Sequence, residues 1–184
     1  MAIKRVLHYG EATLREPSKE VHKVSKKIND LIRDLFDTMY AQNGVGLAAP
    51  QIGVNLRVFV IDASTKEEPL EPMVFINPKI IKKSGAVKSS EGCLSFPEAY
   101  TDVVRYKDVM IKAINAHGKP FVLEAKDGSL LARCIQHEND HLNGILFIDH
   151  CLNRFETEDI LEKNNLPSID PDKLIDETEL KEQL

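Results

Sequence analysis

Gln136-His137-Glu138-Asn139-Asp140-His141 is the stretch of this 184-residue chain that decides how its fold and chemistry are interpreted. Residues four apart leave the same face of an α-helix, so a helix here would let His137 and His141 bind one cation. Glu138, beside the first histidine, could then exchange a proton with a water molecule on that cation. Because H-E-x-x-H also occurs by chance in unrelated proteins, it predicts a metal site only together with its surroundings.

The residues around this stretch favour a short, partly buried helix. Asp127-Gly128-Ser129 offers a turn and a cap before it, and Gly144 can end it. Apolar side chains recur at helical spacing along it: Leu130, Leu131, Cys134, Ile135 and Leu142. We therefore expect both histidines on a helix that belongs to the core.

A catalytic metal site needs three protein ligands and one open position, so a third ligand must come from elsewhere. One class of metallopeptidase adds a third histidine as H-E-x-x-H-x-x-G-x-x-H, but Phe147 occupies that position here. Cys134 lies one turn before the first histidine and is better explained as a buried apolar residue. Nothing in the setting of His150 and Cys151 favours ligation, which leaves Cys93 as the remaining candidate.

Two further segments have an unusual composition. Residues 90–97 read S-E-G-C-L-S-F-P, and their glycine and proline predict an irregular, tightly shaped segment rather than a plain strand. A cysteine there, taken alone, is more often a buried residue than a ligand. Residues 44–51 read G-V-G-L-A-A-P-Q, and glycines spaced in this way let the backbone approach a ligand closely.

Taken together, the three segments resemble the peptide deformylase family, which removes the formyl group from the N-terminus of nascent bacterial polypeptides. The family has a glycine-rich segment ending in Pro-Gln, a Glu-Gly-Cys-Leu-Ser segment and a Gln-His-Glu-x-Asp-His-Leu-x-Gly helix. This chain contains all three in the same order. The similarity extends from about Ile3 to Asp149, with a modest loop around Lys66 to Pro72 that resembles the compact bacterial form.

The resemblance implies that Cys93, His137 and His141 are metal ligands and that Glu138 is the general acid and base. It also implies one divalent metal ion per chain, with Fe²⁺ as the physiological ion. Two histidines and one cysteine accept Zn²⁺, Ni²⁺ or Co²⁺ as well. The alternative is a non-catalytic protein with a structural metal, which would need a fourth ligand such as Cys134.

The resemblance also implies how the substrate is held. Gln51 matches the side-chain donor to the formyl oxygen, and the backbone N–H of Leu94 is its partner. Gly46 matches a position whose backbone contacts the substrate, and Glu91 would pair with Arg105 to support the segment that carries the cysteine. An apolar pocket for the methionine side chain is expected from Val45, Leu94, Leu130, Cys134 and His137. Tyr100 and Arg133 replace residue types that are common in the family, so finer substrate preferences are not predicted.

Composition sets the remaining expectations. The formal net charge of −5 disfavours nucleic acid as a direct ligand. No stretch approaches the roughly 20 apolar residues of a membrane span. Three cysteines and an N-terminus without an apolar run favour the cytoplasm. The resemblance implies nascent formylated polypeptides as the partner, and it allows a transient association with the ribosome.

The chain is expected to form one α+β catalytic domain over residues 1–150, with antiparallel strands arranged around the central histidine helix. An earlier packing helix is predicted from Ser25 to Gln42. Strands are predicted over Arg57–Asp62, Met73–Ile81, Asp102–Ala113 and Pro120–Ala125, the last two forming a hairpin through Ala116–Lys119. His8, His22 and His117 are expected at the surface.

Residues 151–184 are expected to form an acidic C-terminal tail of short helices. They contain ten Asp and Glu against four Lys and Arg, a net charge of −6, which leaves about +1 for the rest of the chain. Pro167 and Pro171 should interrupt any helix there. Because the composition suggests a solvated appendage that packs weakly on the domain, we expect hydrolysis of a short peptide not to need it.

Overall fold

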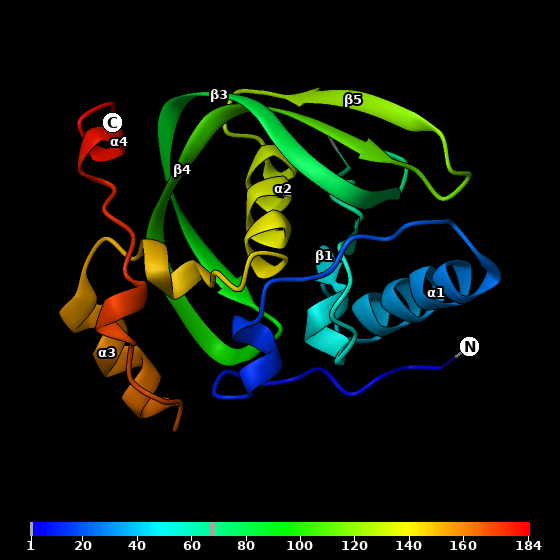
Figure 1. Ribbon diagram of the computed structural model, residues 1–184. Helices are drawn as coiled ribbons and strands as arrows, with labels where there is room; N and C mark the ends of the chain where they lie inside the picture. Colours follow the sequence, from blue (N-terminus) through cyan, green and yellow to red (C-terminus); the bar gives the residue numbers. More distant parts are fainter. Residues whose placement is uncertain (1, 67–68) are drawn as a thin grey trace.

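The structure is a computed structural model that describes residues 2–66 and 69–184, so two residues of the loop expected around Lys66 to Pro72 lie outside it. It confirms the predicted α+β class, with one antiparallel sheet and a central helix (Figure 1). The α-helices are α1 (Lys26–Ala41), α2 (Leu130–His141), α3 (Arg154–Lys163) and α4 (Thr178–Lys181). The 3₁₀ turns are η1 (Ala12–Arg15), η2 (Ala49–Ile52), η3 (Phe147–His150) and η4 (Pro171–Lys173).

The sheet contains five described strands that follow one another in chain order, each antiparallel to the next. They are β1 (Gly46–Ala48), β2 (Val58–Ile61), β3 (Met73–Cys93), β4 (Phe96–Ile114) and β5 (Pro120–Ala125). The hairpin of β4 and β5 agrees with the sequence prediction, whereas β1 was not predicted. With only three residues, β1 is too short to carry a recognisable alternation of apolar and polar side chains.

Strands β3 and β4 are much longer than the sequence predicts. Their pairing continues from Ile76↔Ile114 to Cys93↔Phe96, so the predicted ends at Ile81 and Asp102 are wrong. Lysine and serine are frequent in the second half of β3, which hides it from a hydrophobic pattern. Each strand supplies the other's backbone partners, so the ladder extends past residues with low strand propensity.

The segment 90–97 is also more regular than predicted. Cys93 ends β3, Phe96 begins β4, and the two intervening residues form the turn. The pairing shifts register between Gly92 and Cys93, which re-aims the side chain at the end of the strand. The glycine and proline of this segment therefore mark the tip of a long hairpin rather than an irregular loop.

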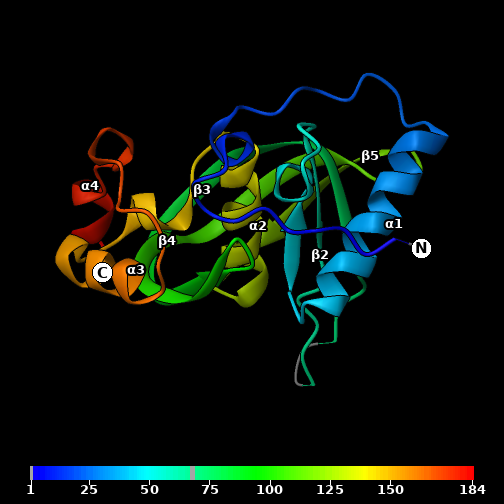
Figure 2. The ribbon, with the colours of Figure 1, turned by 90° about the horizontal axis from the view of Figure 1, so that it is seen from below.

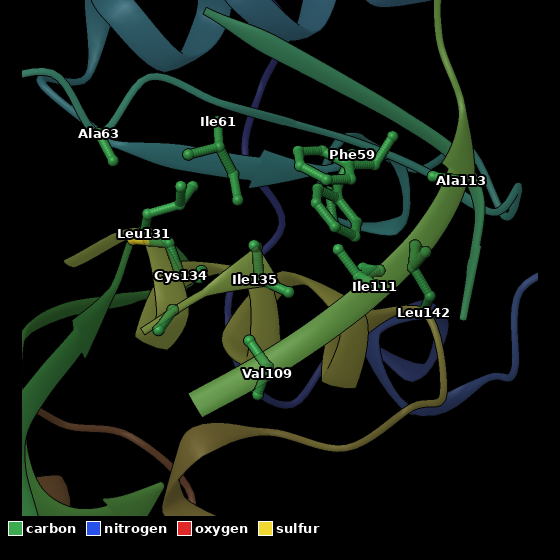
Figure 3. Close-up of a cluster of buried hydrophobic side chains, with 14 residues drawn as sticks. Phe59, Ile61, Ala63, Val109, Ile111, Ala113, Leu131, Cys134, Ile135 and Leu142 are labelled. Atoms are coloured by element: carbon green, nitrogen blue, oxygen red, sulfur yellow. The ribbon is translucent and has the colours of Figure 1, made fainter. Parts of the chain in front are cut away.

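Helix α2 is enclosed by the sheet and by the hairpin (Figure 1). Ser129 caps it, because its Oγ accepts a hydrogen bond from the backbone N–H of Ala132 at 3.3 Å. Its apolar face packs in a cluster with residues of β2, β3 and β4. Figure 3 shows part of this cluster, with Leu131, Ile135 and Leu142 from the helix and its end against Phe59, Ile61, Val109 and Ile111 from the strands. This packing fixes the helix that carries the histidines.

Helix α1 packs against β1 and β2 on the side of these strands that faces away from α2 (Figure 2). Its apolar face buries Leu35 and Met39 completely, together with Leu47 of β1. This second cluster holds β1 and η2 in place, so it positions the segment 44–51 at the site. No helix in the described parts of the chain has the length and apolar character to cross a membrane.

The tail is more firmly attached than its acidic composition suggests. It packs beside the end of the β3–β4 hairpin (Figure 2), and Leu161, Ile169 and Leu180 are at most 4% exposed. The backbone N–H of Ile175 donates to the carbonyl of Asp149 at 2.9 Å. Phe155, by contrast, is 87% exposed. The tail therefore has a buried inner side and a solvent-facing outer side.

Candidate metal centre

The structure brings Cys93, His137 and His141 together. One donor atom from each lies within 4.8 Å of the others, and Cys93 Sγ is 3.2 Å from His141 Nε2. The cysteine comes from the tip of the hairpin and the histidines from successive turns of α2. Two imidazoles and a thiolate at such distances are a donor set for a transition metal.

A hydrogen bond fixes the orientation of His137, and burial decides the protonation of His141. His137 Nδ1 lies 3.0 Å from Glu91 Oε2, so its other ring nitrogen is left for a cation. Burial, and then the charge of His137, lowers the pKa of His141 well below its ordinary value, which favours the neutral ring that a metal needs. His141 therefore presents a lone pair beside the cysteine sulfur, and His137 directs its Nε2 to the same space.

Glu138 is almost fully buried beside this cluster. Its Oε2 has no hydrogen-bond partner in the part of the chain that the structure describes. Burial is the main reason that the pKa of Glu138 rises to about 7. A buried carboxylate oxygen without a partner is costly, so the site fits a bound cation and the water that accompanies it.

Gly46 leaves room for this carboxylate. A Cβ atom at Gly46 would lie 2.5 Å from Glu138 Oε1, closer than carbon and oxygen can approach without moving one of them. The backbone of β1 therefore runs directly past Glu138. This contact gives a physical reason for the glycine that the sequence analysis singled out.

Gln51 has a fixed amide orientation. Its Oε1 accepts from the backbone N–H of Ala48 at 2.8 Å, and its Nε2 donates to Ser95 Oγ at 3.2 Å and lies 3.4 Å from Cys93 Sγ. The NH₂ group therefore points toward the cluster. Ser95 was not assigned a role from the sequence, although it is the last residue of the Glu-Gly-Cys-Leu-Ser segment.

A cavity of about 710 Å³ opens onto the cluster. It brings together the predicted substrate-contacting residues from the start of β1 and the residue before it, the hairpin tip and α2: Val45, Gly46, Leu94, Leu130, Cys134 and His137. Arg133 and Tyr100 also line it, as do Lys4, Arg5 and His8 of the N-terminal segment. The contribution of the N-terminal segment was not predicted, because these residues belong to no motif.

Cys134 does not join the metal cluster among the described residues. It is buried in the apolar core, and burial raises the pKa of its thiol to about 12, so it remains protonated. Phe147 packs edge-on against Phe96 with ring centroids 4.9 Å apart. Neither residue therefore supplies a further ligand, and the observed donor set is an open, three-ligand one.

A buried ion-pair network supports the cluster. Arg105 donates from Nε and Nη2 to the two oxygens of Glu91, each at 2.9 Å, as the resemblance implied. Arg105 also donates from Nη1 to Asp140, which the sequence analysis did not identify as a site residue. Burial opposes ionisation of Glu91, but Arg105 and His137 outweigh it and hold the pKa of Glu91 well below its usual range. Glu91 is therefore a carboxylate that holds His137 in orientation.

Comparisons with known proteins agree with this geometry. The family model described as polypeptide deformylase matches residues 3–157. Peptide deformylase of Pseudoalteromonas translucida is 49% identical over 150 residues, which cover 82% of this chain and 87% of that protein. Peptide deformylase 1 of Clostridium acetobutylicum is 48% identical over 149 residues, covering 81% and 95%.

Solved structures show the same likeness. The chain superposes on a Synechococcus elongatus peptide deformylase in complex with actinonin with a TM-score of 0.84 and 40% identity, covering 92% of this chain and 90% of that one. For the Legionella pneumophila peptide deformylase the TM-score is 0.82 at 43% identity, covering 89% and 94%. The match covers the hairpin, the glycine-rich segment and the histidine helix together. The chain therefore belongs to the peptide deformylase family.

Proposed function

We propose that this chain removes the formyl group from N-formylmethionine at the N-terminus of nascent polypeptides, with Cys93, His137 and His141 holding one divalent metal ion. The observation that carries the proposal is a buried oxygen of Glu138 that has no hydrogen-bond partner among the described residues and lies beside three converging donors. When bound there, the metal ion supplies Lewis-acid activation of the formyl group and of a water molecule. The residues around it then orient the substrate and move protons.

Glu138 is proposed as the proton carrier. It accepts a proton from the attacking water and returns it to the amine as the C–N bond breaks, so that formate and a free N-terminus leave. A pKa near neutrality suits a group that must both accept and release a proton. Burial keeps bulk water from competing for that proton.

Gln51 and the backbone N–H of Leu94 are proposed as the donors to the formyl oxygen. Removing one such donor costs about 3 kcal/mol of transition-state stabilisation in other hydrolases. The contacts of Gln51 with Ala48 and Ser95 hold its amide in place before substrate arrives. The site therefore pays little reorganisation when charge develops on the oxygen.

The pocket accounts for the proposed preference for methionine. Val45, Leu130 and Cys134 offer an apolar wall that suits a flexible thioether. A formyl group is small, whereas the methyl of an acetyl group would crowd the space between the metal and Gln51. N-acetyl peptides are therefore expected to be poor substrates.

Fe²⁺ is the proposed physiological metal, and activity should decline in air as the ion oxidises. Reconstitution with Ni²⁺ or Co²⁺ should restore it. Full, air-stable activity with Zn²⁺ alone would contradict the assignment of iron. A protein with a purely structural metal is disfavoured. It would need a fourth ligand, and it would have no use for Glu138 or Gln51.

The direct test is release of formate from a formyl-methionyl tripeptide by the metal-loaded protein. Glu138→Gln should abolish most turnover, while Glu124→Gln, which removes a charge from β5 away from the cavity, should not. Release of formate at the same rate by both variants would refute the proposed proton carrier. No release by the metal-loaded parent would refute the function.

We also propose that the enzyme works in the cytoplasm on chains leaving the ribosome. The acidic tail, with its net charge of −6, should not itself bind ribosomal RNA, because phosphate contacts depend on Lys and Arg. Co-sedimentation with ribosomes, compared between the full chain and one that ends at Asp149, tests this point. A salt-sensitive loss on truncation would show that the tail contacts a basic ribosomal protein.

A further inference from the structure

A chain of buried charges runs from the tail to the metal cluster. Its outermost member is Glu177, just before α4, whose Oε1 lies 2.6 Å from His150 Nδ1. The other ring nitrogen of His150 lies 3.0 Å from Asp140 Oδ2. The side chains of His150 and Glu177 are each only 10% exposed, so this is a buried contact rather than a surface ion pair.

His150 must carry a proton on both nitrogens to satisfy this arrangement. Ionised carboxylates accept hydrogen bonds and cannot donate them, and His150 has one on each side. Burial and the charge of Arg105 lower the pKa of His150, but its bonds to Asp140 and Glu177 outweigh them and raise it above the ordinary value. The ring is therefore a cation that links the tail to α2.

The inner half of the chain reaches a metal ligand. Asp140 accepts from Arg105, Arg105 holds both oxygens of Glu91, and Glu91 accepts from His137 Nδ1. Charges alternate in sign along the whole path from Glu177 to Glu91. Removing the carboxylate of Glu177 would leave His150 with Asp140 as its one partner in this chain of contacts. The hydrogen bond between His150 and Asp140 would then change, and with it the contact that Asp140 makes with Arg105.

We propose that Glu177 and His150 are positioning residues, through which the tail holds the orientation of His137 and so sets the metal affinity of the site. Only the expected effect on turnover rests on the proposed function; the expected effect on metal affinity does not. The family match ends at residue 157, so Glu177 lies outside the segment that the family model covers. The tail is then part of the active centre, which reverses the expectation from composition that hydrolysis does not need it.

The test compares single carboxylate-to-amide changes within the tail. Glu177→Gln keeps the size of the side chain and removes its charge, and Glu177→Asp keeps the charge. Glu179→Gln is the matched control, because Glu179 lies in α4, two residues after Glu177, but is exposed. Ile169→Ala controls for stability, because it removes buried apolar volume from the tail without touching the network.

The first readout is Co²⁺ affinity of the metal-free protein, followed by absorption against a competing chelator. Partners that hold a metal-binding histidine directly change affinity by about 10- to 100-fold. Because Glu177 is several contacts away, we expect Glu177→Gln to weaken Co²⁺ binding about 3- to 10-fold. Glu177→Asp should recover part of the loss, and Glu179→Gln and Ile169→Ala should stay within about 2-fold of the parent.

The second readout is steady-state kinetics on a short formyl-methionyl peptide. Glu177→Gln should lower kcat and leave KM unchanged, since the cavity wall is intact. A His150→Gln/Glu177→Gln double variant should lose no more than the larger single loss, because both act on one path.

Equal Co²⁺ affinities for Glu177→Gln and Glu179→Gln would overturn the proposal. So would an equal weakening by Ile169→Ala, which would reduce Glu177 to an anchor for the tail. If the parent releases no formate but Glu177→Gln still weakens Co²⁺ binding selectively, the proposed function fails and the positioning role stands.

Discussion

The histidine helix and the C-terminal tail both deliver charged side chains to one buried network, but they do so by different means. Helix α2 places its two histidines, Glu138 and Asp140 within five consecutive positions, where helical geometry alone decides which of them meet. The tail delivers Glu177 across 27 residues to His150, and only the packing of the tail determines that contact. The difference shows that part of this site is specified by local spacing and part by the whole fold.

The largest expected effect lies at the hairpin tip. Cys93→Ala should lose the metal and with it nearly all turnover, because two histidines alone do not complete the site. Metal content per chain and formate release measure this directly. Cys151→Ala, at the start of the tail, is the matched control and should retain both. A metal-loaded Cys93→Ala protein would show that the hairpin tip does not supply a metal ligand.

On the helix itself, Glu138→Gln should separate chemistry from metal binding. We expect one metal ion per chain and a fall in kcat on the order of 10²-fold or more, because proton transfer is lost while the ligands remain. Metal analysis and kinetics on the same preparation provide the check. A metal-free Glu138→Gln protein would mean that this carboxylate is a ligand.

The apolar contacts of the tail, unlike Glu177, should affect stability more than chemistry. Leu161 is 1% exposed, and Leu161→Ala should lower the free energy of unfolding by about 2–4 kcal/mol. Phe155→Ala, on the exposed side of the same helix, should change it by less than about 0.5 kcal/mol. Urea denaturation of both variants measures the contrast. Similar losses from both would show that the tail does not pack as described.

The smallest expected effect is a pH dependence at the contact between the two regions. His150→Gln should cost about 2 kcal/mol at pH 6, the scale of hydrogen bonds to charged groups. The pKa of His150 is raised in the folded protein above its ordinary value of 6.5, so its stabilising effect is complete below that pH. It is lost as the pH rises through the folded pKa. The charged neighbours on all sides are Asp140, Glu177 and Arg105.

Urea unfolding of the parent and of His150→Gln, from pH 5.5 to 9, follows this difference. A gap between the two proteins that widens as the pH rises would contradict a protonated His150 in the folded state.

The parts of the molecule that the sequence predicts are those governed by short-range rules. The period of α2 and the i,i+4 spacing of His137 and His141 placed both imidazoles on one helical face, and the structure has them there. The α+β class followed from several strands grouped around one buried helix. The proximity of Cys93 was anticipated from the resemblance rather than from the cysteine itself, because an isolated cysteine is usually only a buried residue.

The remaining features depend on contacts between distant residues. The length of β3 could not be predicted, because its exposed lysines and serines carry no strand pattern and are held by pairing with β4. Asp140 looked like one more polar residue of a helix until its contact with Arg105 was visible. Glu177 resembled every other acid of the tail, and no sequence pattern relates it to His150.

With Cys93 as the proposed metal ligand, its position at the hairpin tip would link metal supply to the lifetime of the protein. The cysteine and His141 are 48 residues apart, and they meet only when the hairpin has closed over α2. A metal that bridges them binds the native chain and not the unfolded one, so its binding energy adds to folding. At a free metal concentration 100 times Kd this contribution is about 2.7 kcal/mol, enough to lower the unfolded fraction about 100-fold. In a cell short of metal, more copies of the chain would be unfolded at any moment and open to proteases, so scarcity would reduce the amount of enzyme as well as its occupancy.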